Sequence, residues 1–245
     1  MSRTCRLLDL DFADLDVTAA ARRIAERSDT APFSYVVTPN ADHLVRLSRN
    51  PSLLPLYQDA MLCLLDSRVV ARTARLLGLP SPTVATGSDL TARLFAAHVA
   101  AGERVTIIGL RAAYLDVLVA RTGIAPPAHY DPPMGFDGDP AEMQRTVRFV
   151  LDHPSRLVFL AVGSPRQERL AAAIAASGAA HGTGLCIGAS LEFLAGIVPR
   201  APAIMQGLGI EWLHRMASNP RRLARRYLID SPPIFRLLLR ERLSR

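Results

Sequence analysis

Lysine and long apolar runs are absent from this 245-residue chain, which has only three cysteines. Cys5, Cys63 and Cys186 stand far apart and outside any CxxC or Cys/His spacing, so no disulfide framework is implied and we expect buried, inert thiols. No stretch of 18 or more uncharged apolar residues occurs, and the N-terminal segment lacks the apolar core of a signal peptide. We therefore expect a cytoplasmic protein without a membrane-spanning helix.

Recognised metal-binding patterns are missing as well. The six histidines show neither HExxH nor another ligand spacing. Three Asp-x-Asp pairs, a pattern that can hold a divalent ion, occur at Asp9/Asp11, Asp14/Asp16 and Asp137/Asp139. The first two precede the first clear strand and the third begins a helix, where aspartate favours the helix dipole, so we expect solvated or capping roles. The sequence thus predicts no metal site and no other cofactor.

Positive charge is concentrated at the C-terminal end of the chain. Residues 1–199 contain 19 arginines and 19 acidic residues, whereas residues 200–245 contain ten arginines and three acids, so the net charge of +7 resides in the tail. Such a patch needs an anionic partner: a lipid surface, a nucleic acid or a phosphorylated substrate. Trp212, Tyr227 and Phe235 are interleaved with these arginines, and that mixture favours helices lying on an anionic membrane.

Short apolar runs that end in small or polar residues alternate with helix-like periodicity. The runs are FSYVV before Thr38, LCLL before Asp66, VTII before Gly109, LVFLAV before Gly163 and LCI before Gly188. Helical periodicity covers residues 87–101, 111–121, 139–152 and 165–177. Buried parallel strands read as continuous apolar runs, so this repetition predicts an α/β fold with a Rossmann-like parallel sheet flanked by helices.

The pattern changes after Pro199. The last part of the chain is helical in composition but is interrupted by Pro220, Pro232 and Pro233. We therefore assign residues 1–198 to a Rossmann-like core and residues 199–245 to an arginine-rich appendage of two or three short helices.

The residues that follow the apolar runs are the first candidates for a site, because open parallel sheets bind ligands beyond the carboxyl ends of their strands. Asp66 either works as a catalytic carboxylate or caps the helix predicted for residues 68–77. Thr38 and Asn40 lie at another strand-to-helix turn, where Asn40 either caps the helix or binds a substrate hydroxyl. The turn GSPRQE, residues 163–168, offers a helix N-terminus suited to an anion, although it matches neither GxGxxG nor GxxxxGK[ST].

Six segments of this chain together resemble a known family. They are TPNADHLVRL, LLDSRVV, TGSDL, VGSPRQE, GASLEFLAGIVPRAP and LGIEWLHRMASNPRRLARRYL. Their order and spacing, over residues 8–238, are similar to those of the WecG/TagA/CpsF glycosyltransferases, glycosyltransferase family 26. The resemblance implies an inverting, metal-independent transferase of Rossmann-like fold. It also implies a UDP-sugar donor, a polyprenyl-diphosphate-linked sugar as acceptor, and a role in building cell-surface polysaccharide.

The resemblance carries site roles onto matching positions. It implies that Asp66 is the catalytic base. The substrate-binding residues that it implies are Thr38, Asn40, Gln167, Arg215, Arg222 and Arg225, the three arginines closing over the active site. With the basic tail, it implies peripheral attachment to the inner face of the bacterial cell membrane. UDP-N-acetylmannosamine, its uronic acid and UDP-glucose all remain possible donors, since pocket shape decides among them.

The chain departs from the family pattern at two places. Val84 stands where relatives carry an arginine three residues before the glycine of the GSD turn, and Leu65-Asp66-Ser67 stands where they read Pro-Asp-Gly. The first departure leaves open which cation steadies the leaving diphosphate, with Arg75 or a tail arginine as candidates.

Two other classes of protein share parts of this pattern. A non-enzymatic basic module could use the Rossmann-like core as a scaffold and bind nucleic acid through its tail, but the tail lacks the aromatic-glycine signatures of RNA-binding modules, so we expect no nucleic-acid partner. A nicotinamide-dependent oxidoreductase would need the glycine fingerprint, which is missing.

Overall fold

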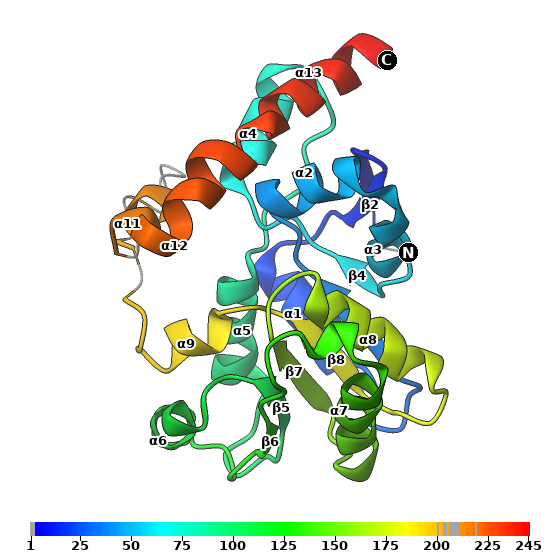
Figure 1. Ribbon diagram of the computed structural model, residues 1–245, viewed down its shortest axis with the longest axis vertical. Coiled ribbons are helices and arrows are strands. Elements are labelled where there is room, and N and C mark those ends of the chain that lie inside the picture. Colours follow the sequence, from blue (N-terminus) through cyan, green and yellow to red (C-terminus); the bar gives the residue numbers. More distant parts are fainter. Residues whose placement is uncertain (1–2, 200, 203–204, 206–210, 219) are drawn as a thin grey trace.

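The computed structural model describes residues 3–199, 201, 202, 205, 211–218 and 220–245. Its centre is a parallel sheet flanked by helices, as the sequence predicted (Figure 1). The sheet has six strands in the order β4-β3-β8-β7-β5-β6. The strands are β3 (Ser34–Val37), β4 (Leu62–Cys63), β5 (Thr106–Gly109), β6 (Ala128–Tyr130), β7 (Leu157–Ala161) and β8 (Thr183–Cys186). Apart from β6, these strands lie within or overlap the predicted apolar runs.

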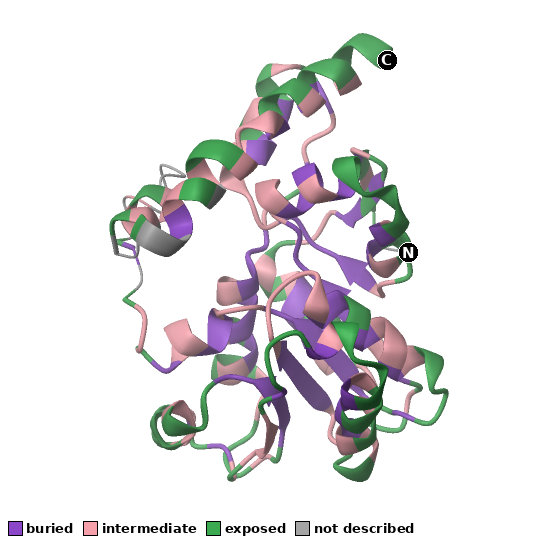
Figure 2. Cartoon of the chain, in the orientation of Figure 1, coloured by how far each residue is buried: buried purple, intermediate pink, exposed green. Residues whose placement is uncertain are grey.

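Helices cover both faces of the sheet, so both strand faces are buried (Figure 2). One face is covered by α2 (Ala41–Arg49), α3 (Pro55–Gln58), α7 (Pro140–Asp152) and α8 (Arg166–Ala176). The other is covered by α1 (Val17–Ala25), α5 (Gly87–Ala97), α6 (Leu115–Thr122) and α9 (Ser190–Leu194). Alternate residues of β7 point to opposite faces of the sheet. Val158 and Leu160 pack in the hydrophobic cluster under α2, α3, α7 and α8, and Leu157 and Phe159 pack in the cluster on the other face. This pattern explains why the strands read as continuous apolar runs.

Several helix starts lie at the carboxyl edge of the sheet and are capped by side chains. Asn40 accepts hydrogen bonds from the backbone N–H groups of the first turn of α2, Ser67 does so for α4 (Arg68–Leu76), and Thr86 for α5. A cap oxygen satisfies an N–H group that the helix itself leaves open. The caps therefore fix where these helices begin and how they approach the sheet edge. Single 3₁₀ turns η1 (Pro51–Leu53), η2 (Ala112–Tyr114) and η3 (Phe136–Gly138) join other elements.

An N-terminal hairpin was not predicted from the sequence. Strands β1 (Thr4–Leu7) and β2 (Leu10–Ala13) pair antiparallel through a two-residue turn in which Leu8 and Asp9 both have positive φ. Glycine and asparagine normally occupy such positions, so the turn carries no recognisable signal. Phe12 of β2 is fully buried, and the hairpin joins the core beside β4.

The C-terminal segment is helical, as predicted. It contains α11 (Glu211–Ser218), α12 (Pro220–Arg225), the π-helical turn η4 (Arg226–Asp230) and α13 (Pro233–Ser244). Helix α13 packs against α2 and α4, and Ile234 and Leu238 are buried with the main core cluster (Figure 1). The last helix is thus part of the core's packing.

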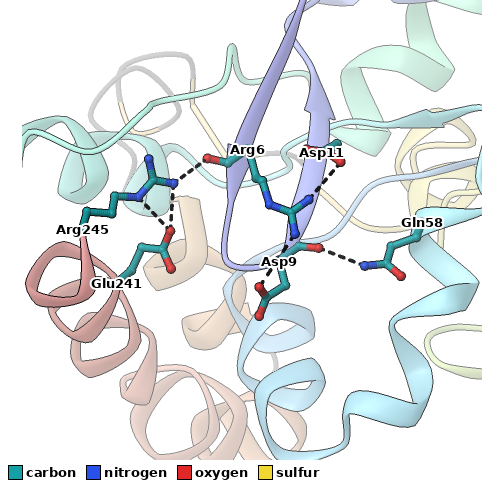
Figure 3. Close-up of polar contacts among 6 residues, drawn as sticks. All are labelled: Arg6, Asp9, Asp11, Gln58, Glu241 and Arg245. Carbon is teal, nitrogen blue, oxygen red and sulfur yellow. Dashed lines mark hydrogen bonds and ion pairs between the residues drawn. The ribbon is translucent and has the colours of Figure 1, made fainter.

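Polar contacts fasten the end of α13 to the N-terminal hairpin (Figure 3). The Arg245 guanidinium donates to the backbone oxygen of Arg6 at 3.2 Å and pairs with Glu241 at 2.9 Å. Arg6 pairs in turn with Asp11 across the hairpin at 3.1 Å. These groups are exposed, so each contact contributes little stability, and the buried leucine and isoleucine carry most of the attachment.

Candidate active site

A cavity of about 570 Å³ lies at the carboxyl ends of the parallel strands. Its floor comes from the segments after β3, β4, β7 and β8 and from the start of α5: residues 38, 40–43, 66–69, 86, 88, 163, 164, 167 and 187–190. Phe193 and residues of the C-terminal helices complete the wall: Glu211, Trp212, Tyr227, Leu228, Ser231, Pro232, Ile234 and Phe235. The position matches the place where open α/β sheets bind ligands.

Helix N-termini converge on this cavity. The first residues of α2, α4, α5, α8 and α9 all contribute to its lining. Each helix start has backbone N–H groups without an intrahelical partner and the positive end of a helix dipole. Their convergence favours anionic groups, phosphates above all.

Asp66 lies on the floor, at the end of the segment that follows β4. Its backbone N–H donates to Pro39 O at 2.9 Å, and its Oδ2 accepts the backbone N–H of Gly87 at 3.2 Å. The capping role left open by the sequence belongs to Ser67, whose hydroxyl accepts the N–H of Val70. The Asp66 carboxylate is therefore directed to the start of α5 and lines the cavity.

Gly87 lets α5 approach the floor closely. A Cβ placed there would lie 3.0 Å from Thr38 Oγ1, 3.4 Å from Ser190 Oγ and 3.7 Å from Asp66 Oδ2. Three polar side chains from three different strand ends thus surround one glycine. Any side chain at residue 87 would have to displace at least the nearest of them.

Thr38 and Asn40 both line the cavity, as the sequence suggested. The Thr38 hydroxyl is buried and donates to Cys186 O at 3.3 Å, which ties β3 to β8. Asn40 Oδ1 caps α2 by accepting the N–H groups of Asp42 and His43 at 3.1 and 3.4 Å. The capping alternative for Asn40 is therefore confirmed, and its side chain still faces the cavity.

Gln167 is buried and its amide is held by protein groups at both ends. Its Oε1 accepts the backbone N–H of Gly188 at 2.9 Å, and its Nε2 donates to Glu168 Oε1 at 2.9 Å. These bonds join α8 to the turn after β8. Burial raises the pKa of the Glu168 carboxyl, because removal from water disfavours its charged form, and the hydrogen bond from Gln167 opposes this shift.

Ser164 belongs to a second polar cluster beside the cavity. Its hydroxyl accepts from Arg46 at 2.9 Å and lies 3.1 Å from the Tyr57 hydroxyl. Arg46 also pairs with Asp42 at 2.8 Å. No sequence pattern indicated this cluster, because its members come from α2, α3 and the turn after β7, which lie far apart along the chain.

Of the three tail arginines named by the sequence, only Arg225 has a described side chain. The side chains of Arg215 and Arg222 fall outside the described residues. Arg225 does not line the cavity; its side chain is 82% exposed and 3.8 Å from Asp230. Arg75, the other candidate cation, is exposed in the last turn of α4, and Arg68 of the first turn lines the cavity instead.

The Asp-x-Asp pairs have structural partners. Asp139 caps α7 at the helix start predicted for its pair, and Asp16 caps α1, within the solvated or capping role expected of it. Asp14 accepts two hydrogen bonds from Thr83, and Asp137 pairs with Arg169 at 2.8 Å. Among the described residues no group of three or more potential ligands is placed to hold a metal ion. The cysteines are free thiols; burial raises the pKa of Cys63 and Cys186, which agrees with the inert role expected of them.

The fold and the cavity define an α/β protein of Rossmann-like arrangement with a large cavity at the carboxyl edge of its parallel sheet. Comparison with known families matches residues 5–245 to the Glycosyl transferase WecG/TagA/CpsF family. The chain belongs to that family and is a glycosyltransferase of cell-surface polysaccharide synthesis. The family also indicates a sugar-nucleotide donor and a lipid-linked acceptor. No helix in the described parts of the chain is long and apolar enough to span a bilayer.

Proposed function

We propose that the protein transfers a sugar from a UDP-sugar to a polyprenyl-diphosphate-linked sugar, with inversion at the anomeric carbon and without a metal ion. The observation that carries the proposal is the placement of the Asp66 carboxylate in a cavity ringed by helix N-termini. A carboxylate suits proton removal, and the helix starts suit a diphosphate. The donors in question are UDP-N-acetylmannosamine, its uronic acid and UDP-glucose.

In this mechanism Asp66 accepts the proton of an acceptor hydroxyl as that oxygen attacks the anomeric carbon from the face opposite UDP. The new C–O bond forms as the bond to the phosphate oxygen breaks, and UDP leaves with the electron pair. One displacement inverts the configuration. General base catalysis of this kind contributes roughly 10²- to 10⁴-fold in rate.

Charge on the leaving diphosphate needs donors in place of a metal. Backbone N–H groups at the starts of α4 and α5 supply some, since both starts line the cavity. We propose that Arg215, Arg222 and Arg225 supply the rest when the tail closes. Because Arg225 is exposed in this structure, its contribution requires movement of the tail.

The cavity wall is suited to a substrate with an apolar part. Trp212 and Tyr227 lie in ring contact, with centroids 5.9 Å apart, and Phe193, Leu228 and Phe235 line the same cavity. Thr38 and Asn40 provide polar groups for a sugar on the floor. We propose that Gln167 holds the turn at Gly188 in place and does not contact the substrate directly, because both ends of its amide already bond to protein groups.

We propose that the C-terminal helices also dock on the inner face of the bacterial membrane. Several large apolar side chains are exposed there: Leu228, Ile229, Phe235, Leu239 and Leu243. Exposed arginines lie among them: Arg236, Arg240 and Arg242 on α13, and Arg245 just after it. An apolar and basic surface of this kind binds anionic lipid, and docking would bring the cavity to its lipid-linked acceptor.

The test is acceptor-dependent release of UDP by the full-length protein. A panel of UDP-sugars and lipid-diphosphate-sugar acceptors in vesicles is incubated with a chelator present. We expect release with one pair, and a loss of roughly 10²- to 10⁴-fold in kcat for Asp66→Asn with UDP binding nearly intact.

The matched control is Asp59→Asn. Asp59 is exposed beyond the end of α3 and does not line the cavity, so its variant should keep the wild-type rate. Release that requires added metal would refute metal independence. Equal rates for the two variants would remove Asp66 as the base.

A further inference from the structure

Arg68 is the sole arginine among the described residues that line the cavity. The chain contains no lysine, so arginine alone supplies permanent cations. The same lining holds three carboxylates, from Asp42, Asp66 and Glu211. A phosphate entering this space meets like charges and needs a nearby cation to offset them.

The position of Arg68 adds to its charge. It is the first residue of α4, next to the cap Ser67 and two residues after Asp66. Arg68 thus lines the cavity at the start of a nine-residue helix, whose first N–H groups have no partner within the helix. A phosphate there would accept hydrogen bonds from side chain and backbone together.

Arg68 is also loosely held compared with other arginines near the site. Its guanidinium lies 4.0 Å from Asp89 Oδ2, which is beyond hydrogen-bond distance, and its side chain is 33% exposed. Arg46, in contrast, donates to Asp42 at 2.8 Å and to Ser164 at 2.9 Å. Exchanging a contact at 4.0 Å for a phosphate costs little, whereas Arg46 would have to break two short bonds.

We propose that Arg68 binds a phosphate of a substrate diphosphate in this cavity. The inference rests on the proposed function for the identity of the substrate, but the phosphate contact itself can be tested without transfer. The diphosphate belongs either to the nucleotide donor or to the lipid-linked acceptor, and the two sources give different results.

The experiment compares wild-type protein with Arg68→Ala, Arg68→Lys and the control Arg75→Ala. Arg75 lies on the same helix, about 10 Å further along its axis, is exposed and does not line the cavity. Calorimetry measures binding of inorganic diphosphate, UDP and uridine, steady-state kinetics give KM for donor and acceptor, and thermal unfolding checks the fold.

We expect Arg68→Ala to weaken inorganic diphosphate binding about ten- to hundred-fold, as the loss of a charge-assisted hydrogen bond predicts. Uridine binding should stay unchanged, because uridine carries no phosphate. Arg68→Lys should recover part of the affinity, and Arg75→Ala should differ from wild type by less than about twofold. If Arg68→Ala weakens UDP binding to a similar extent, Arg68 contacts the diphosphate of the nucleotide donor. If only the KM for the acceptor rises, Arg68 contacts the diphosphate of the lipid-linked acceptor.

The proposal is overturned if Arg68→Ala binds inorganic diphosphate as wild type does and leaves both KM values unchanged, or if uridine binding falls equally. Should wild-type protein bind diphosphate through Arg68 yet transfer no sugar with any pair, the proposed function fails while the phosphate contact stands.

Discussion

Gly87→Ala tests directly whether the floor geometry governs catalysis. The added methyl would sit 3.0 Å from Thr38 Oγ1 and 3.4 Å from Ser190 Oγ, so those groups must shift by a few tenths of an ångström. Asp66 Oδ2 would lie 3.7 Å from the added methyl, an ordinary contact distance. It also accepts a hydrogen bond from the backbone N–H of residue 87 itself. The shift should therefore reach Asp66, the proposed base, through its hydrogen bond from the Gly87 N–H.

Stability and activity should respond differently to this change. Alanine is favoured over glycine within a helix by about 0.5–1 kcal/mol, which offsets much of the local crowding, so the free energy of unfolding should change by less than about 1 kcal/mol. Misplacing catalytic groups by about 1 Å can cost 10²-fold in rate, so a smaller shift should lower kcat by roughly ten-fold or more.

The assay pairs acceptor-dependent UDP release with urea unfolding. Gly138→Ala is the matched control, because a Cβ there meets nothing within 4 Å and the glycine has no positive φ. We expect the control to keep both activity and stability. Full activity in Gly87→Ala would refute the idea that close approach of α5 to Thr38 and Asp66 sets the reaction geometry.

Two further predictions concern stability. Burial raises the pKa of Glu168 above its ordinary value of 4.5. As pH rises above about 4.5, the unfolded chain therefore releases a proton that the folded state still holds, and the free energy of unfolding should fall. The free energy of unfolding of the wild type should therefore depend on pH, by up to about 1.4 kcal/mol per pH unit, and Glu168→Gln should remove this dependence. Urea unfolding from pH 5 to 8 measures it. An unchanged dependence in Glu168→Gln would show that another group causes it. Leu238→Ala should lower the free energy of unfolding by about 2–5 kcal/mol, because the Leu238 side chain is fully buried. Leu243 is 78% exposed on the same helix, so Leu243→Ala should lower it by less than about 0.5 kcal/mol. Equal losses in the two variants would show that α13 does not pack as described.

The sequence was sufficient to predict five of the six strands of the sheet and several residues that line the cavity floor. Buried parallel strands need apolar side chains on both faces, so FSYVV and LVFLAV could be recognised without any partner strand. Parallel strands all end at the same edge of a sheet, so the residues that follow them are expected to lie close together. Thr38, Asn40, Asp66 and Gln167 do line one cavity at that edge.

Features that depend on contacts distant in sequence were not predictable. The hairpin turn at Leu8 and Asp9 uses positive φ without glycine, and the short strand β6 is only partly buried, so neither has a compositional signature. The bond between Gln167 and Gly188 joins two strand ends 21 residues apart, and no spacing rule reveals it. Arg68 could have been found, since it begins the helix that follows Asp66, but its charge alone gave no reason to prefer it to Arg75.

The packing of α13 changes what tail removal should do. If the tail completes the active site as proposed, a chain that ends near Pro199 should be nearly inactive. The structure adds that Ile234 and Leu238 are buried in the core, and their burial contributes roughly 1.5–3 kcal/mol each as an upper estimate. Against a typical total of about 5–15 kcal/mol, the shortened chain should stay folded but unfold at a lower temperature.

Activity and stability can be separated by changing only the cavity wall. Trp212→Ala removes a side chain that lines the cavity and contacts Tyr227, yet Trp212 lies in neither of the two core clusters. If the tail completes the active site, this variant should release UDP more slowly while its unfolding midpoint stays close to that of wild type. A variant with normal rates would leave loss of stability as the sole reason for inactivity after truncation, and closure of the tail over the substrate would have to be abandoned.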